Sequence, residues 1–122
     1  MTKPSGFRQL TVWQKAIQLS LDVYHATKRM PADERFGLTS QMRRAAVSIG
    51  ANIAEGYASR GPKNRARFFA MSKTSAKELR HYVILTQMLG FLTPSELPEA
   101  SVDEVCAMLY RLWESNCPAE DR

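Results

Sequence analysis

The stretch from Phe36 to Gly56, FGLTSQMRRAAVSIGANIAEG, constrains the fold more than any other part of this chain. At 3.6 residues per turn, its apolar residues fall on two sides of a helix. The first side fills an arc roughly 100° wide, the usual width of a core-facing stripe, with Leu38, Met42, Ala45, Ala46, Ile49 and Ile53. The second side lies nearly opposite and consists of Val47, Ala51 and Ala54. A helix in a small bundle needs one buried face, so we expect the second to contact another subunit.

Many side chains of this stretch are small. Close approach of another backbone is permitted by Ala45, Ala46, Ser48, Gly50, Ala51 and Ala54. A glycine in the middle of a helix costs about 1 kcal/mol relative to alanine, so Gly50 implies close packing that offsets this cost.

The preceding segment predicts a helix over about residues 10–29, which Pro31 prevents from continuing. One apolar stripe contains Leu10, Trp13, Ile17, Leu21 and Tyr24, and another contains Val12, Ala16, Leu19, Val23 and Ala26. Together they cover roughly 220° of the helix, more than one groove buries. We therefore assign Val12, Leu19 and Val23 of this helix to a subunit interface. Val47, Ala51 and Ala54 of the following helix belong to the same predicted interface.

Three further helices follow, and no segment is typical of a strand. The second is expected over 37–56, with Gly56 as its stop, and the third over 62–90, with Pro62 in its first turn. The fourth is expected over 102–115, because Ser101 to Glu104 resembles a capping box; an earlier box at Thr93 to Glu96 is interrupted by Pro98. The sequence predicts one all-α domain over 1–122, an up-down-up-down four-helix bundle.

Composition disfavours several other classes of protein. The chain is 44% hydrophobic and 24% charged, close to average globular usage. No apolar run approaches the roughly 18 to 20 residues of a membrane span, and the start MTKPSGFRQL lacks the apolar core of a signal peptide. We therefore expect a cytoplasmic protein without membrane association. Cys106 and Cys117 match no zinc or redox spacing.

Charge is distributed unevenly along the chain. The net charge is +5, but residues 35–80 hold ten lysines and arginines against two glutamates. From residue 96 onward, seven acidic residues stand against two arginines. This polarity fits either a basic surface for nucleic acid or complementary surfaces that pair within or between subunits.

The basic residues after Gly56 are the candidate nucleic-acid contacts. A loop and helix start carry Arg60, Lys63, Arg65 and Arg67, and one face of the third helix continues with Lys73, Lys77 and Arg80. Phosphate could meet both side chains and backbone N–H groups here, without reading sequence. The alternative is an ordinary solvated face, partly neutralised by the acidic C-terminal helix.

A polar strip on the second helix has two interpretations. Its residues, spaced to line one face, are Arg44, Ser48, Asn52 and Glu55. They could form a ligand or catalytic cluster, or a hydrogen-bonded polar seam with Ser75, Glu78 or Arg60. We favour the structural seam, because Glu55 lacks the partners that acid–base chemistry requires. His25 and His81 complete no metal site, and no serine elbow or phosphate loop is present. We expect no enzymatic activity, metal or cofactor.

Several of these motifs resemble a known family. They are FRQLTVWQKA at residues 7–16, FGLTSQ and RRAAVSI within residues 36–49, NIAEG at residues 52–56, and Ser75, Glu78 and Leu79 before Leu89-Gly90. The chain resembles the four-helix bundle protein family, also known as 23S rRNA intervening-sequence proteins, which includes accessory proteins of diversity-generating retroelements. Two departures concern the outer end of the bundle: Thr74 stands where many relatives have glycine, and Pro98 breaks a last helix that is usually longer.

The resemblance implies a homo-oligomer, a ring of five, with no enzymatic activity. It also implies a link to nucleic acid, because the retroelement relatives are basic and work beside reverse transcriptase and RNA. Our hypothesis is a self-assembling scaffold or adaptor that binds RNA or DNA non-specifically, with a reverse transcriptase or other protein as a further partner. The alternative is an interaction module for an acidic protein partner, without nucleic acid.

Overall fold

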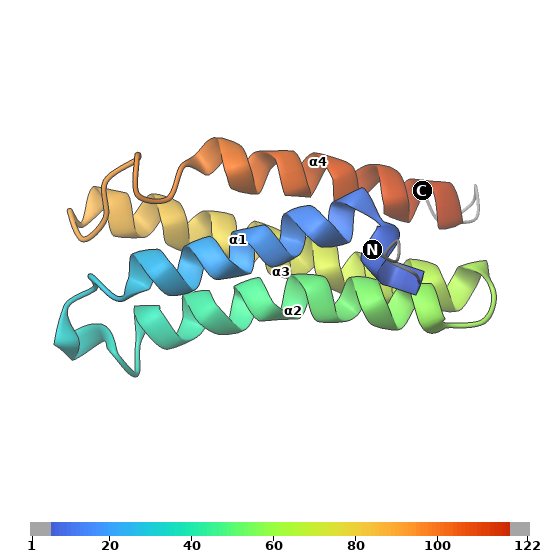
Figure 1. The fold of residues 1–122 in the computed structure, drawn as a ribbon, viewed down its shortest axis with the longest axis horizontal. Coiled ribbons are helices and arrows are strands. Elements are labelled where there is room, and N and C mark those ends of the chain that lie inside the picture. The colour runs from blue at the N-terminus through green and yellow to red at the C-terminus, as the bar shows by residue number, and fades with distance from the viewer. Residues whose placement is uncertain (1–5, 118–122) are drawn as a thin grey trace, which may run out of the picture.

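A computed structural model describes residues 6–117 of the chain and confirms the all-α prediction. Its four helices are α1 (Thr11–Thr27), α2 (Leu38–Ala58), α3 (Pro62–Met88) and α4 (Glu99–Asn116), with short 3-10 turns at η1 (Gly6–Gln9) and η2 (Ala32–Glu34). Successive helices run in opposite directions and lie side by side (Figure 1). Within residues 6–117 there is no strand, and none of the helices combines the length and apolarity needed to cross a membrane.

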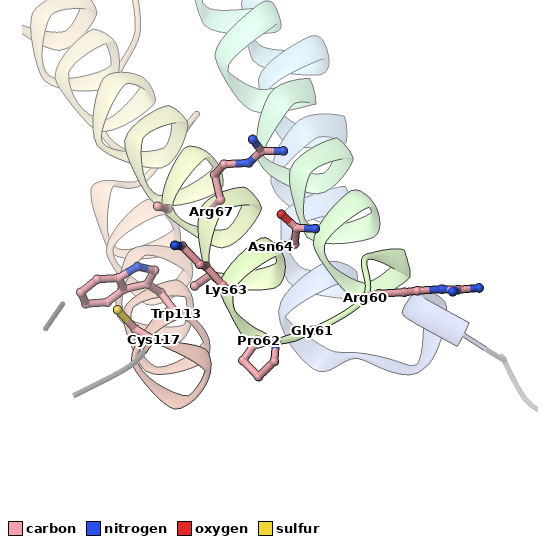
Figure 2. A pocket seen from close by; sticks show the side chains of 10 residues that line it. Arg60, Gly61, Pro62, Lys63, Asn64, Arg67, Trp113 and Cys117 are labelled. Atoms are coloured by element: carbon pink, nitrogen blue, oxygen red, sulfur yellow. The ribbon is translucent and has the colours of Figure 1, made fainter. Parts of the chain in front are cut away.

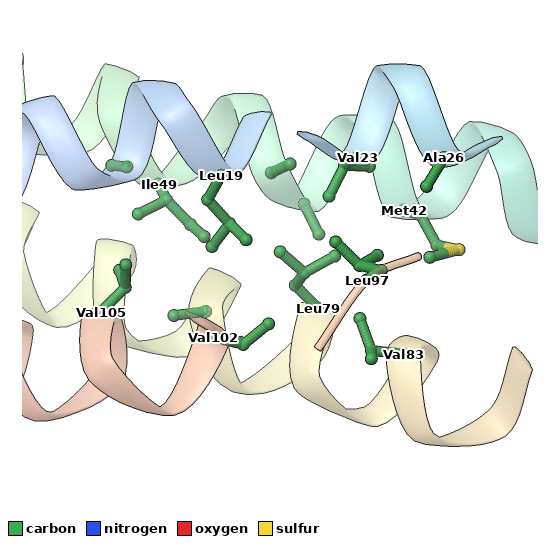
Figure 3. Packing of buried hydrophobic residues seen from close by; sticks show 14 of the residues in the cluster. Leu19, Val23, Ala26, Met42, Ile49, Leu79, Val83, Leu97, Val102 and Val105 are labelled. Carbon is green, nitrogen blue, oxygen red and sulfur yellow. The ribbon is translucent and has the colours of Figure 1, made fainter. Parts of the chain in front are cut away.

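All four helices contribute to one apolar core. Leu19 of α1, Ile49 of α2 and Leu79 of α3 project into the space between the helices, where Val102 and Val105 of α4 meet them (Figure 3). The α2 stripe predicted to face the core does so, since Met42, Ala46, Ile49 and Ile53 are completely buried. The hydrophobic periodicity of α2 therefore identified its inner face correctly.

The two apolar stripes of α1 have the opposite roles to those predicted. Val12, Leu19 and Val23 are only 6%, 2% and 0% exposed and belong to the core of the chain itself. They are not available to a second subunit, which corrects the interface assignment. The exposed stripe instead contains Ile17, Leu21 and Tyr24. Tyr24 can keep its hydroxyl group in water while its ring contacts apolar neighbours. The smaller aliphatic side chains of the other stripe pack among the other helices.

Gly56 does not end α2, which continues to Ala58. Its role is steric, because a Cβ atom at this position would lie 2.5 Å from Cε1 of the buried Phe69 ring on α3. At Gly50 an added Cβ would lie at ordinary contact distances, 3.6 Å from Ile17 Cδ1 and 3.7 Å from Trp13 Nε1. Close helix approach therefore requires glycine at Gly56 but only a small residue at Gly50.

The fourth helix begins earlier than predicted, at Glu99 instead of near residue 102. Thr93 donates from its backbone N–H and its Oγ1 to Glu96 Oε1, at 2.9 and 3.0 Å, and this closes a turn that lies before α4. Pro98 occupies the position before the first helical residue, Glu99. A proline is tolerated there because the first helical turn needs no internal N–H donor. Ser101 therefore lies inside α4 and is not its cap.

Candidate nucleic-acid interface

The turn between α2 and α3 carries the basic residues expected to contact phosphate. Gly61 has a φ of +79°, a left-handed conformation that suits glycine, and Pro62 follows as the first residue of α3. The residue at the N-cap position of this helix, Gly61, makes no side-chain capping hydrogen bond. We call the exposed cations at this turn the basic end: Arg60, Lys63, Arg65 and Arg67.

The basic end keeps its charge largely unneutralised. Among the described residues, none of its four side chains forms an ion pair with a carboxylate. Arg65 donates from Nε to the backbone oxygen of Ser59 at 3.0 Å, and the Arg67 guanidinium lies 5.3 Å from the centre of the Phe68 ring. The positive charge is therefore concentrated beside the uncapped N-terminus of α3, where the helix dipole also favours anions.

The remaining basic residues of α3 are arranged differently. Arg80 Nε lies 2.7 Å from Asp103 Oδ1 on α4, and its NH2 group lies 3.9 Å from Glu99 Oε2. Lys73 Nζ lies 3.8 Å from the centre of the Trp113 ring. Partial burial lowers the pKa of Lys73, and the neighbouring charge of Lys77 lowers it further. The predicted row of seven basic residues is thus divided, because α4 engages Lys73 and Arg80.

A hollow of about 690 Å³ lies between the basic end and the last turns of α4. We call it the basic hollow; it is lined by Arg60, Gly61, Pro62, Lys63, Asn64, Ala66, Arg67, Ala70, Trp113 and Cys117. Lys63 and Trp113 lie beside each other in Figure 2, whereas the Arg60 side chain extends away from both. Trp113 comes from the last turns of α4, and nothing in the spacing of that helix indicated that it would meet the α2–α3 turn.

The polar strip of α2 forms part of the predicted seam. Ser48 and Ser75 share a hydrogen bond of 2.8 Å between their Oγ atoms, and Asn52 Nδ2 donates to Ser48 Oγ at 3.0 Å. In the described part of the chain, the side chains of Arg44 and Glu55 form no hydrogen bond with this group. Hydrogen bonds between side chains therefore join three of the predicted seam residues, Ser48, Asn52 and Ser75.

Glu78 and Ser72 of α3 also form hydrogen bonds on this side of the bundle. Glu78 accepts a hydrogen bond of 3.2 Å from the Tyr82 hydroxyl, and it lines a polar hollow of about 420 Å³ with Arg44 and Ser75. The fully buried Ser72 donates to the backbone oxygen of Ile49 at 2.8 Å. Within residues 6–117, no three His, Cys, Asp or Glu side chains gather closely enough to hold a metal ion.

A second candidate surface lies on the outer side of α1 and α2. Tyr24, Phe36 and Val47 line one hollow of about 580 Å³ together with Arg35, Arg43 and Arg44, and Phe36 is 88% exposed. Ile17 and Leu21 of α1 and Ala51 of α2 are exposed as well. We call the whole set the α1–α2 apolar face: Ile17, Leu21, Tyr24, Phe36, Val47 and Ala51. Ala54 is half-buried at its margin.

Comparison with known proteins agrees with this fold. No curated protein matches the chain. The profile of the 23S rRNA-intervening sequence protein family matches residues 8–111, which run from η1 through most of α4. This match includes the motifs that carry the resemblance described above, except for Phe7 at the start of the first motif. The chain therefore belongs to the 23S rRNA-intervening sequence protein family.

Proposed function

We propose that this protein is a non-enzymatic, cytoplasmic scaffold or adaptor that assembles with copies of itself. The observation that carries the proposal is the α1–α2 apolar face, where Leu21 is 58% and Val47 is 48% exposed. Contiguous exposed apolar surface on a small soluble domain marks an interaction site. Burial of one large aliphatic side chain contributes about 1.5–3 kcal/mol, so several of them together favour association.

A second copy of the chain is the occupant that this face fits best. Ala51 is exposed and Ala54 is half-buried, and both side chains are small, so a partner helix can approach α2 closely. The ring of five that the family resemblance implies would use this face repeatedly. A ring also requires a second, different contact patch on each subunit, because each interface is then heterologous.

Assembly is tested by measuring molar mass in solution with multi-angle light scattering. Val47→Glu and Leu21→Glu should each reduce the mass, because a charge would be buried in the interface, while leaving the helical circular dichroism unchanged. Met88→Glu is the matched control, since Met88 is 81% exposed at the end of α3 and away from this face. A monomeric unaltered protein, or an unchanged mass in both variants, would contradict the assignment.

A second function is favoured by the basic end. Its four exposed cations and the uncapped N-terminus of α3 form the kind of site that contacts phosphate without reading bases. We propose that the basic end binds the backbone of RNA or DNA. In an oligomer, repetition of this site would increase avidity for a long polymer.

Binding is tested by fluorescence anisotropy with generic RNA and duplex DNA at several salt concentrations. Lys63→Glu combined with Arg67→Glu should abolish binding, and the affinity of the unaltered protein should fall steeply with salt. Lys28→Glu combined with Arg29→Glu is the charge-matched control at the opposite end of the bundle. Equal loss in both double variants would indicate an effect of net charge alone. Absence of binding at low salt would favour an acidic protein or a reverse transcriptase as the partner of this surface.

A further inference from the structure

We propose that the basic hollow accepts one unpaired nucleotide, so that single-stranded nucleic acid is the preferred ligand. This inference rests on the proposed nucleic-acid binding and specifies the class of ligand. The hollow holds about 690 Å³, within the range of roughly 300–1,000 Å³ found for small-molecule sites. It is therefore large enough for a base with its sugar and phosphate.

Opposite chemistry lines the two sides of the basic hollow. The α3 side supplies Lys63 and Arg67, which are one helical turn apart and share a face of the helix. Among residues 6–117, no acidic side chain lines the hollow. Figure 2 shows the Lys63 ammonium on the α4 side and the Arg67 guanidinium pointing away from it, so each offers N–H donors that suit a phosphate group.

Trp113 supplies an aromatic surface on the α4 side. Its ring is fixed by contacts outside the hollow, because Lys73 Nζ lies 3.8 Å from the ring centre and the Tyr110 ring lies 5.8 Å away, centre to centre. Ala66 and Ala70 add small apolar side chains to the lining. An indole held in place beside cations is the combination with which proteins bind single-stranded nucleic acid, since every base offers a face for stacking.

The same arrangement disfavours a base-paired strand as the ligand for Trp113. In a duplex the faces of the bases are stacked on one another, and only their edges and the phosphates are accessible. A duplex could therefore use Lys63 and Arg67 but not the indole. We expect single-stranded DNA to bind about tenfold more tightly than a duplex with the same number of phosphates, a factor within the range of one base–aromatic contact.

The test compares a fluorescein-labelled twelve-residue thymidine strand with a DNA hairpin of equal phosphate number, in which a polyethylene glycol linker replaces the unpaired loop nucleotides, by anisotropy at one salt concentration. Trp113→Leu should weaken binding of the single strand about tenfold and leave hairpin binding unchanged. Trp113→Phe keeps an aromatic face and should largely preserve the preference. Thermal melting by circular dichroism shows whether each variant is folded. In addition, irradiation of the unaltered protein with a strand containing 5-iododeoxyuridine should attach the strand to Trp113, as mass spectrometry of the peptides would show.

Each outcome bears on a distinct claim. Loss of the preference in Trp113→Leu and its retention in Trp113→Phe, with the covalent adduct on Trp113, would support the inference. Equal affinity for strand and hairpin, or adducts only on other residues, would overturn it while leaving phosphate binding at the basic end intact. Failure of the unaltered protein to bind either probe would overturn both the inference and the proposed nucleic-acid function.

Discussion

The α3 helix is joined to its two main neighbours in contrasting ways. Its contact with α2 is made by small and hydroxyl-bearing residues: Gly56 lies against Phe69, and Ser72 donates to the backbone of Ile49. Its contact with α4 has an apolar interior, but the solvent edge is closed by long side chains, as Arg80 pairs with Asp103 and Lys73 covers Trp113.

The difference shows how one helix can combine a rigid contact with an adaptable one. The α2–α3 contact depends on close approach of backbones, so that one added methyl group matters. The edge of the α3–α4 contact depends on flexible, partly solvated groups that individually contribute little to stability. The second kind of contact has a functional consequence, because it determines which basic residues of α3 remain available to a ligand.

The largest effect on stability is expected at Gly56. Replacement by alanine places a methyl group against the buried Phe69 ring and should lower the free energy of unfolding by about 1–2 kcal/mol, after allowing for the better helix propensity of alanine. Gly50→Ala, where the new Cβ meets only ordinary contacts, should instead stabilise the protein by up to about 1 kcal/mol. Urea denaturation of both variants measures the contrast, and equal effects would refute the steric role of Gly56.

A smaller loss is expected at Ser72. Ser72→Ala removes the buried hydrogen bond to the Ile49 carbonyl and should cost about 1 kcal/mol. Thr74→Ala is the control, because the Thr74 hydroxyl is exposed and bonds within its own helix to Ala70. Its effect on the free energy of unfolding, measured by urea denaturation, should be within about 0.5 kcal/mol. A larger cost at Thr74 than at Ser72 would contradict the importance of the buried α2–α3 hydrogen bond.

Lysines at the two parts of α3 should differ in function. Lys63→Met should reduce by about 1 the slope of log affinity for nucleic acid against log salt concentration, because a free phosphate contact is lost. Lys73→Met should leave that slope unchanged and lower stability by less than about 1 kcal/mol, since its ammonium is engaged by Trp113. Salt titrations of binding check both variants. A reduced slope for Lys73→Met would contradict our inference that Lys73, engaged by α4, does not contact phosphate.

The smallest effect concerns the turn before α4 and depends on pH. Hydrogen bonds from the backbone and side chain of Thr93 hold the pKa of Glu96 below its ordinary value of 4.5. The folded state therefore favours the ionised carboxylate. This contribution to stability is fully present above about pH 4.5 and is lost as the pH falls through the lowered pKa. Glu96→Gln should be less stable than the unaltered protein near neutral pH, and the difference should narrow in urea denaturation carried out at decreasing pH.

The sequence pattern predicted α2 well and α1 only in part. Within α2, the side with Met42, Ile49 and Ile53 has more and larger apolar residues than the side with the exposed Val47, so the pattern indicates which side is buried. In α1 both stripes are apolar, so periodicity cannot determine which one faces the core. That choice depends on how the side chains fit against three other helices.

The sequence pattern also could not predict contacts between segments that are far apart in the sequence. A glycine at the end of an apolar period resembles a helix stop, and only the position of Phe69 on the next helix shows why Gly56 lies inside α2. The basic row on α3 could be recognised from its spacing, but the division of that row depends on Asp103 and Trp113 of α4. The indole beside the α2–α3 turn depends likewise on helix packing.

The arrangement of the helices brings both ends of the described chain to the end of the bundle that carries the α2–α3 turn (Figure 1). A dye or fused domain attached next to residue 6 or 117 would therefore stand near the proposed ligand and could obstruct it. The connection between α1 and α2, which contains η2, lies at the opposite end, separated by the 17 residues of α1, or about 25 Å of helix. Reporter groups inserted there would leave the basic end open, and a circularly permuted chain that starts there would keep every helix intact.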